Sequence, residues 1–310
     1  MNLQATSLHC PNSRYSDPMK VLNFGSLNID HVYRVPHTVQ PGETLAAANY
    51  QCFAGGKGLN QSVALARAQT GIEILHAGMI GIEGIFLKEL LEGEGVNCEN
   101  ISISHTIPTG QALIQVADNG ENSIVLFGGA NQAIPTTAVA TALNRLSAGD
   151  FVVLQNEISV TPDVIRQAAK RQMRVFFNPA PMGPEVFSYP LEYVDTLILN
   201  ETEAIALQEQ IPLACKHCNL LLTLGSRGAC YQPAGGEQKI KIAAVPVEKV
   251  VDTTAAGDTF MGYFVAALAA RMELQAALEL SARAAAVTVS RPGAAASIPH
   301  RTELLVRDCR

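Results

Sequence analysis

The stretch Asp252-Thr253-Thr254-Ala255-Ala256-Gly257-Asp258-Thr259-Phe260 joins an apolar, strand-like run, Ala243–Val251, to an alanine-rich helix pattern at about 258–270. Small residues at the start of a helix leave backbone N–H groups free and open to a ligand. Together with the helix dipole, such N–H groups bind anions. The sequence therefore predicts an anion site at this junction, built from Ala255, Ala256 and Gly257.

Asp258 lies beside this predicted anion site, in the first turn of the helix. A carboxylate in that place could accept the proton of an attacking hydroxyl, while the N–H groups stabilise charge on a transferring phosphoryl group. A simpler interpretation stays open, in which Asp258 is only a helix cap and Ala-Ala-Gly only a tight turn. The motif alone does not decide between the two.

Outward from this stretch, strand and helix patterns alternate along the chain. Short runs of β-forming residues are followed by helical patterns, which is typical of a mostly parallel sheet with helices on both faces. The predicted strands are 21–24, 72–77, 151–154, 175–177, 196–199 and 220–224. The predicted helices are 58–69, 87–91, 162–171, 201–207, 258–270 and 274–290.

Two stretches break this alternation. Residues from about 32 to 53 carry little helix signal and contain a Pro41-Gly42 turn. Residues from about 108 to 128 contain Asp118-Asn119-Gly120 between β-forming runs, which is the pattern of a hairpin. We expect both stretches to form a small separate sheet, a lid, inserted into one domain that spans residues 19–310. Residues 1–18 are polar and aperiodic, and we expect them to be a loose tail.

The composition limits the classes of function. The chain has 310 residues, of which 48% are apolar and 16% charged, so a large core can form. Its net charge is −6 without a Lys/Arg cluster, and no apolar run could span a bilayer or serve as a signal peptide. We therefore expect neither nucleic acid nor membrane as partner. The seven scattered cysteines, with a lone Cys215/Cys218 pair, indicate thiols in a reducing cytoplasm rather than disulfides or a zinc site.

Polar residues follow several of the predicted strands. Ligands of open parallel sheets bind beyond the carboxyl ends of the strands. Asn28 and Asp30 follow the first strand, and their spacing of two points both side chains the same way, as would suit sugar hydroxyls. Each such cluster could instead be a turn or a cap, but five of them at strand ends favour a ligand site. The clusters are residues 25–30, Glu157, 200–203, 223–228 and 252–258.

The run Gly55-Gly56-Lys57-Gly58-Leu59-Asn60 looks at first like a phosphate-binding P-loop. A P-loop has four residues between its glycines, followed by Lys and Ser or Thr, and that spacing is absent here. We interpret the run as a glycine turn that enters a helix, with Asn60 projecting near the helix start.

Taken together, these motifs resemble the ribokinase family of carbohydrate kinases over about residues 20–301. The glycine turn Gly55–Asn60 and the heptad Asp252–Asp258 match its two signatures, and Asn178-Pro179-Ala180-Pro181 lies between them as in the family. The resemblance implies a three-layer α/β sandwich around a nine-stranded, mostly parallel sheet, with a small β lid. It also implies transfer of a phosphoryl group from ATP to a sugar.

The resemblance further implies roles for individual residues. Asp258 resembles the catalytic base and Ala255, Ala256 and Gly257 the anion hole. The sugar contacts would be Asn28, Asp30, Gly56, Lys57, Gly58, Asn60, Glu157 and Asp258. The nucleotide contacts would be Asn200, Thr223, Gly225, Ser226, Gly228 and Gly257. Glu203 resembles the residue that organises Mg²⁺ through water, and K⁺ would lie against Asp252, Thr254, Thr288, Arg291, Gly293 and Ser297.

The substrate follows less directly. Asn28, Asp30 and Asn60 favour a small neutral sugar phosphorylated at a primary hydroxyl, with D-ribose to ribose 5-phosphate as the leading case. A phosphorylated or carboxylated sugar would need more basic residues than Lys57 alone.

Three further expectations remain. A nucleoside would need an aromatic platform, which the lid could supply from Tyr33, Tyr50 and Phe53, so a nucleoside kinase stays open. A non-catalytic protein that binds a sugar or a nucleotide is less favoured, because the base and the anion hole are both present. The two β inserts leave a sheet face to cover, which predicts a homodimer through the lid.

Overall fold

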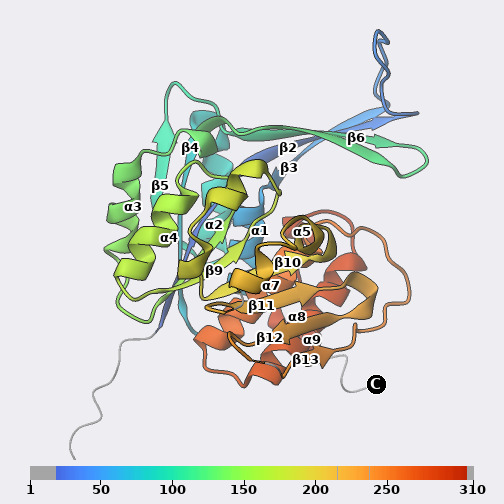
Figure 1. Cartoon of the computed structure of the whole chain (residues 1–310). Helices are drawn as coiled ribbons and strands as arrows, with labels where there is room; N and C mark the ends of the chain where they lie inside the picture. Colours follow the sequence, from blue (N-terminus) through green and yellow to red (C-terminus); the bar gives the residue numbers. More distant parts are fainter. Residues whose placement is uncertain (1–18, 215, 237, 306–310) are drawn as a thin grey trace, which may run out of the picture.

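The computed structural model describes residues 19–214, 216–236 and 238–305. They form a nine-stranded sheet between two layers of helices, and a separate four-stranded sheet projects from this body (Figure 1). This architecture confirms the predicted fold class. The expected tail at residues 1–18, and Cys215 of the cysteine pair, lie outside the described residues.

The large sheet has the strand order β13-β12-β11-β10-β9-β8-β1-β4-β5. Most of its strands run parallel, namely β5, β4, β1, β8, β9, β10 and β11. Strand β12 pairs antiparallel with both of its neighbours, β11 and β13. The central strands are continuous apolar runs because both of their faces are covered. The bounds are β1 Lys20–Phe24, β4 Glu73–Gly81, β5 Asn97–Ser104, β8 Phe151–Gln155, β9 Arg174–Asn178, β10 Thr196–Asn200, β11 Asn219–Thr223, β12 Ala229–Gln232 and β13 Ile240–Ile242.

The helices cover the two faces of this sheet. In β8, Phe151 and Val153 pack into one core, whereas Val152 and Leu154 pack into the other. The first core is closed by α1 Lys57–Arg67, α2 Ile85–Gly93, α7 Ala256–Ala269 and α8 Leu274–Val289. The second is closed by α3 Thr136–Leu143, α4 Thr161–Lys170, α5 Glu201–Ala206 and α6 Ile211–Ala214. The short helix α9, Arg301–Leu305, contacts α8.

The smaller sheet, which we call the lid, has the order β3-β2-β6-β7. It pairs β2 in parallel with β6, while β2–β3 and β6–β7 are antiparallel. Figure 1 shows these strands extending away from the helical body. Several large apolar side chains of the lid are exposed, namely Tyr50, Phe53, Leu113, Ile124, Val125, Leu126 and Phe127. The lid strands are β2 Asn28–Val35, β3 Asn49–Gly55, β6 Gly110–Ala117 and β7 Asn122–Phe127.

One predicted strand is wrong. The structure ends β13 at Ile242, and residues 243–251 are an irregular connection. Pro246 within this run lacks the N–H that a sheet ladder needs. In addition, the pattern missed β5, β12 and β13, which lie at or near the sheet edges, where a continuous apolar run is not required.

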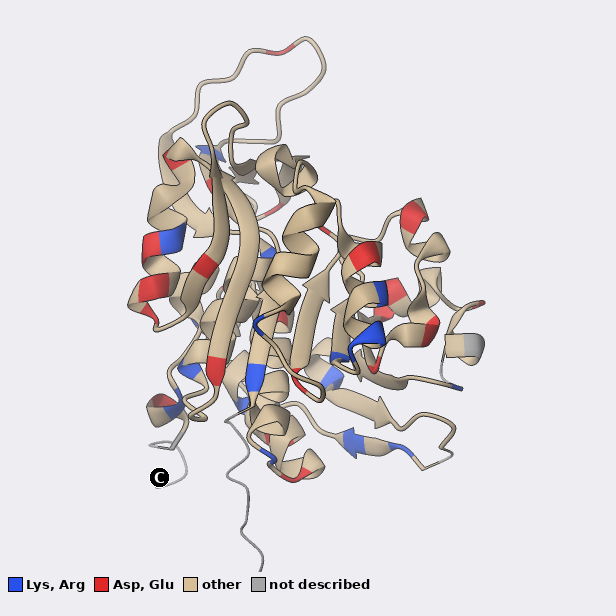
Figure 2. Ribbon diagram, turned by 90° about the vertical axis from the view of Figure 1, so that its left-hand side faces the viewer, with Lys and Arg blue, Asp and Glu red and all other residues tan. Residues whose placement is uncertain are grey.

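No helix in the described part of the chain is long and apolar enough to cross a membrane. Charged residues of both signs are interspersed over the helices in Figure 2.

Candidate active site

The N-terminal turns of α1 and α7 meet at Asp258. This residue is only 7% exposed and lies in the first turn of α7. Gln61 Nε2 donates to Asp258 Oδ1 at 2.9 Å, and Asn60 Nδ2 donates to Oδ2 at 3.3 Å. Two adjacent amides of α1 therefore hold the two oxygens of one carboxylate on α7.

The start of α7 is open to a ligand. Ala255 caps the helix in a left-handed conformation, with φ 61° and ψ 4°. Such a conformation is strained for alanine, and strain of this kind concentrates at functional sites. Ala256 N donates to Thr253 O at a long 3.3 Å. Apart from its chain neighbours and the backbone of its own helix, nothing lies within 4 Å of the position that a Cβ on Gly257 would take. The first N–H groups of α7, which have no partner within the helix, thus border open space.

Asn28 and Asp30 lie on the same face of β2, rather than in a turn beyond β1. Glycines on the neighbouring strands make room for both side chains. A Cβ on Gly55 would lie 2.1 Å from Asp30 Oδ2, and one on Gly110 would lie 2.2 Å from Asn28 Oδ1. Asn131 Nδ2 donates to Asn28 Oδ1 at 2.8 Å and so orients this amide.

Three carboxylates surround Lys57. Glu157 Oε2 accepts hydrogen bonds from Lys57 N at 3.0 Å and from Ser26 Oγ. The negative charge of Asp258, above all, raises the pKa of Lys57, and Glu157 and Glu203 add to this effect. Lys57 is therefore a permanent cation that neutralises part of the negative charge of these carboxylates.

Burial weakens the acids Asp30 and Glu157. Burial raises the pKa of Asp30 to about 7, with a further contribution from the charge of Glu157. Burial also raises the pKa of Glu157 itself, against the opposing effect of Lys57. Asp30 therefore titrates near neutral pH in the ligand-free protein.

One buried acceptor of Asn60 is unpaired. Its Oδ1 is buried and has no hydrogen-bond partner within the described structure. An unpaired buried amide oxygen costs about 1–3 kcal/mol, so a bound molecule that donates a hydrogen bond there would be stabilised.

On the other side of Asp258, Asn200 and Glu203 form a capping box at the start of α5. Asn200 Oδ1 accepts from Glu203 N at 2.8 Å, and Asn200 N donates to Glu203 Oε2 at 2.9 Å. Asn178 Nδ2 donates to the same carboxylate at 3.2 Å. Asn200 is thus a helix cap, and the carboxylate of Glu203, whose pKa is raised by burial, is held in one orientation.

Thr223 and the loop that follows it lie next to Asn200, because Thr223 pairs with Asn200 across β10 and β11. Thr223 Oγ1 donates to Leu199 O at 3.3 Å. The loop 225–228 is largely exposed and begins and ends in positive-φ glycines, with φ 55° at Gly225 and 91° at Gly228. Ser226 is exposed within it.

The residues expected to bind a monovalent cation come from two loops that touch. Asp252 Oδ1 accepts from Thr254 N at 2.9 Å, and its Oδ2 accepts from Gly293 N at 3.0 Å. The remaining side chains are engaged locally: Thr288 Oγ1 with Thr259 Oγ1 at 3.1 Å, Ser297 Oγ with Ala294 O at 2.7 Å and Arg291 Nη2 with Glu303 Oε2 at 2.5 Å. The structure therefore brings the loop at 252–254 against the segment 288–297, which begins in the last turn of α8.

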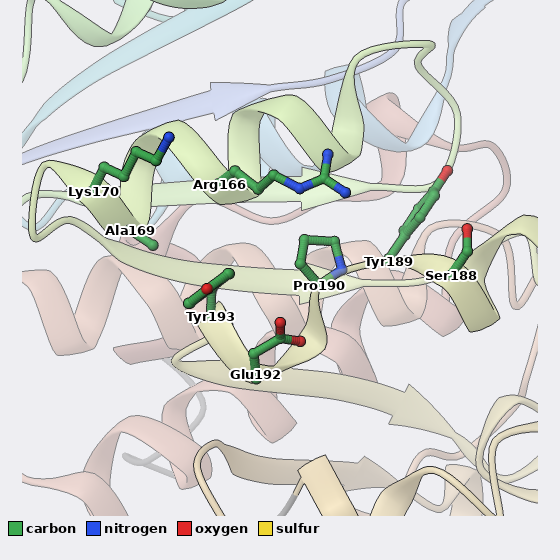
Figure 3. A pocket seen from close by; sticks show the side chains of 8 residues that line it. All are labelled: Arg166, Ala169, Lys170, Ser188, Tyr189, Pro190, Glu192 and Tyr193. Atoms are coloured by element: carbon green, nitrogen blue, oxygen red, sulfur yellow. The ribbon is translucent and has the colours of Figure 1, made fainter.

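A pocket of about 560 Å³ lies elsewhere, between α4 and the segment 188–193 (Figure 3). Helix α4 packs on the face of the sheet opposite to α7. This pocket is consequently separate from the site around Asp258. Its lining residues are Arg166, Ala169, Lys170, Ser188, Tyr189, Pro190, Glu192 and Tyr193.

Sequence reasoning missed three residues of the site: Ser26, Gln61 and Asn131. Gln61 could have been found, since it follows Asn60 in the first turn of a helix already expected to carry ligand contacts. Ser26 lies inside the run 25–30 that was singled out for other residues. Asn131 had no local signal, because it meets Asn28 only through the fold, from 103 residues away.

An open helix N-terminus that can hold a phosphoryl group, beside a carboxylate bound by two amides, is the arrangement of a phosphotransferase that acts on an alcohol group. The family model "pfkB family carbohydrate kinase" matches residues 19–301. Ribokinase of Haemophilus influenzae is 36% identical over 301 residues, covering 91% of this chain and 95% of the relative. The chain belongs to the pfkB family of carbohydrate kinases.

Solved structures agree. Ribokinase of Cryptococcus neoformans in complex with ADP superimposes with a TM-score of 0.81 and 33% identity, covering 93% of this chain and 99% of that one. Arabidopsis thaliana ribokinase complexed with ribose and ATP gives a TM-score of 0.79 and 31% identity, covering 93% and 98% of the two chains.

Proposed function

We propose that this chain is an ATP-dependent kinase of a small neutral sugar, and that it converts D-ribose to ribose 5-phosphate. The observation that carries the proposal is the meeting of α1 and α7 at Asp258. The turn that enters α1 also lies against β2, since a Cβ on Gly56 would be 3.0 Å from Asn28 N. Relatives named ribokinase over nearly the whole chain support the choice of sugar.

In this proposal Asp258 accepts the proton of the primary hydroxyl as that oxygen attacks the terminal phosphorus of ATP. The N–H groups of Ala255, Ala256 and Gly257 stabilise the charge on the transferring phosphoryl oxygens. The long hydrogen bond of Ala256 N to Thr253 O is weak enough to be replaced by such an oxygen. Gly257, Asn200, Thr223, Gly225, Ser226 and Gly228 bind the nucleotide.

The sugar pocket favours a neutral polyol. Asp30 and Glu157 accept hydrogen bonds from hydroxyls, and the unpaired Asn60 Oδ1 accepts another. Asn28, together with the glycine turn Gly56–Gly58, completes the contacts. Lys57 is one cation beside three carboxylates, Glu157, Glu203 and Asp258. These carboxylates would therefore repel an anionic group on the substrate.

A nucleoside substrate is less well supported than the sequence suggested. Residues 28 and 30 share one face of β2, so Tyr33 and its cross-strand partner Tyr50 point to the opposite face. These two rings pack against each other with centroids 5.0 Å apart. Only Phe53, which pairs with Asp30, remains on the substrate side.

Two metal ions fit residues of the site. Glu203, held by Asn178 and Asn200, would orient waters around Mg²⁺, which arrives with ATP and neutralises its phosphates. In the described part of the chain, no three His, Cys, Asp or Glu side chains gather to hold a metal by themselves. A K⁺ ion would fit the two touching loops and fix the one that precedes α7, through oxygens of Asp252, Thr254, Thr288, Arg291, Gly293 and Ser297. Activity in K⁺ that exceeds activity in Na⁺ at equal ionic strength would support this site.

The lid also supports a homodimer. All four residues from Ile124 to Phe127 on β7 are more than half exposed, although successive side chains point to opposite faces. One face closes over the sugar, and a second copy of the chain would cover the other. Light scattering at micromolar concentration should give twice the chain mass, and a monomeric mass would contradict the dimer.

Cys52, Cys98 and Cys230 form no disulfide, in keeping with a cytoplasmic enzyme.

The decisive test of the function is ADP release from ATP with Mg²⁺ and K⁺ against ribose, fructose, other pentoses and nucleosides. We expect turnover with ribose, and a fall in kcat of about 10²–10⁴-fold in Asp258→Asn with ATP binding retained. Turnover with a nucleoside alone would overturn the choice of sugar. An Asp258→Asn enzyme as active as the parent would overturn the assignment of the base.

A further inference from the structure

A connected set of polar side chains inside the core reaches Asp258 through Gln61. Its members Asn23, Gln61, Ser62, His76 and Gln155 are each at most 1% exposed. Polar groups buried to this degree are costly unless they are paired, and within this set Gln155 Oε1 is the one atom left without a partner among the described residues. Such a network is retained at a site where the orientation of a group matters.

The contacts form a continuous chain from the backbone of Gly25, the residue after β1, to Asp258. His76 Nε2 lies 3.3 Å from Gly25 O, and His76 Nδ1 lies 2.7 Å from Ser62 Oγ. Asn23 Nδ2 donates to Ser62 Oγ at 2.9 Å. Gln155 Nε2 donates both to Asn23 Oδ1 at 2.9 Å and to Gln61 Oε1 at 2.6 Å. Gln61 Nε2 then donates to Asp258 Oδ1.

The chemistry of these groups fixes one direction of donation. Burial lowers the pKa of His76 to about 4, so its ring is neutral and carries one proton. Since Gly25 O can only accept, that proton is on Nε2, and Nδ1 accepts from the Ser62 hydroxyl. Ser62 can then accept from Asn23, whose Oδ1 accepts from Gln155. Every amide in the chain is therefore oriented by its neighbour.

Gln61 is constrained from both ends by this arrangement. A flipped amide would place Oε1 against the carboxylate of Asp258 and its NH₂ group against the NH₂ group of Gln155. Both contacts would be repulsive, so the donor of Gln61 stays directed at Asp258 Oδ1.

We propose that Gln61 is a positioning residue for the phosphoryl-transfer step, which it serves by binding Asp258 Oδ1 so that Oδ2 faces the substrate hydroxyl. The inference rests on the proposed role of Asp258 as the base. The bond to Oδ2 comes from Asn60, on the sugar side, and at 3.3 Å it is the longer of the two. Gln61 thus fixes which oxygen of the carboxylate is left for the substrate.

The first variant to test is Gln61→Met, which keeps the length of the side chain and removes the donor. We expect kcat to fall about 10- to 100-fold, while the KM for sugar and the Kd for ATP change less than about 3-fold. The acid limb of the kcat profile should also move relative to that of the parent, because the carboxylate beside the reacting hydroxyl has lost its donor. Thermal melting and ATP titration show whether the variant is folded.

The second variant is Gln61→Glu, which supplies a donor only when the new carboxyl is protonated. At pH 8 the two carboxylates repel, and activity should be below that of Gln61→Met. As the pH falls to 6, activity should rise relative to Gln61→Met because the shared proton restores a hydrogen bond. The other charged groups that interact with Asp258, namely Lys57, Glu157 and Glu203, are the same in both variants.

Ser62→Ala is the matched control, since Ser62 is equally buried, lies on the same helix and belongs to the far end of the same network. We expect it to lower the melting temperature as much as Gln61→Met does, and to leave the pH profile in place. An equal pH shift in Ser62→Ala would overturn the specific role of Gln61. An unchanged kcat and pH profile in Gln61→Met, with Asp258→Asn inactive, would sink this inference and leave the proposed function standing.

Discussion

The site around Asp258 has a sugar half and a nucleotide half, and different kinds of interaction shape them. The sugar half is a set of mostly buried side chains that hold one another, such as Asn131 on Asn28, Ser26 on Glu157 and Gln61 on Asp258. In the nucleotide half, the loop 225–228 is largely exposed and is shaped by backbone conformation.

This difference locates specificity. A pocket whose polar groups are already oriented rejects a molecule that leaves one of them unpaired, so the sugar half should discriminate strongly. In the loop 225–228, Arg227 N and Gly228 N donate to Leu224 O and Gly225 O, so the shape of the loop depends on its backbone conformation. The nucleotide half should therefore tolerate changes of side chain but not of backbone. The comparison predicts that side-chain variants act on the sugar and backbone variants on ATP.

The largest effect is expected from Gly228→Ala. Gly228 has φ 91° and ψ −136°, and its Cβ would lie 2.0 Å from Ile242 O. The loop must move, which should raise the KM for ATP at least about 10-fold and cost about 2 kcal/mol of stability or more. The KM for sugar should stay near that of the parent. Initial rates at varied ATP and a thermal melt measure these changes.

Gly225→Ala is its control. Gly225 also has a positive φ of 55°, but no atom lies within 4 Å of its missing Cβ, so the change costs only the left-handed conformation, about 1 kcal/mol. The KM for ATP should change less than about 3-fold. Equal losses in the two variants would show that the position of the loop does not set ATP binding.

Much of the fold could be predicted because its determinants are local. The strands β8, β9 and β10 are covered on both faces, and their apolar runs state this directly. The edge strand β5 includes Asn97, Glu99 and Asn100, and no such rule reveals it. Residues 243–251 failed in the opposite direction, because an apolar run with Pro246 can also be a connection between elements.

The site, too, has residues that local sequence reveals and contacts that only the fold creates. Asp258 and Asn60 could be singled out because each begins a helix after a glycine or alanine turn. Their contact with each other spans 198 residues and depends on how α1 packs against α7. The facing of Tyr33 and Tyr50 depends on the register of β2 with β3, and a shift of one residue would reverse it.

Ribose binding to the sugar half should depend on pH through Asp30. Because burial raises the pKa of Asp30 to about 7, the free site is partly protonated at neutral pH. Hydroxyl donors favour the ionised carboxylate, so ribose binding should release a proton and tighten about 10-fold between pH 6 and pH 8. Calorimetry in two buffers of different ionisation enthalpy measures the released proton. Binding that weakens as pH rises would contradict this role.

The same shift sets a stability trend in the absence of ligand. Between pH 3.8 and about 7 the folded state binds more protons at Asp30 than the unfolded state does. The contribution of Asp30 to folding stability should therefore fall as pH rises through this window. Asp30→Asn should remove the trend and also make ribose binding independent of pH over the same range, while ATP binding stays unchanged.

The smallest effects are expected when a serine is replaced by alanine, once in each half of the site. Ser26 is fully buried and its hydroxyl joins Glu157 to the N-terminus of α1, since it donates to the carboxylate and accepts from Gly58 N at 3.1 Å. Ser26→Ala leaves Glu157 less firmly placed, and the KM for ribose should rise about 3- to 5-fold without change in the KM for ATP. Ser226→Ala, in the exposed loop of the nucleotide half, should change both values by less than about 2-fold. A larger effect at Ser226 than at Ser26 would mean that side chains, and not the backbone, also govern the nucleotide half.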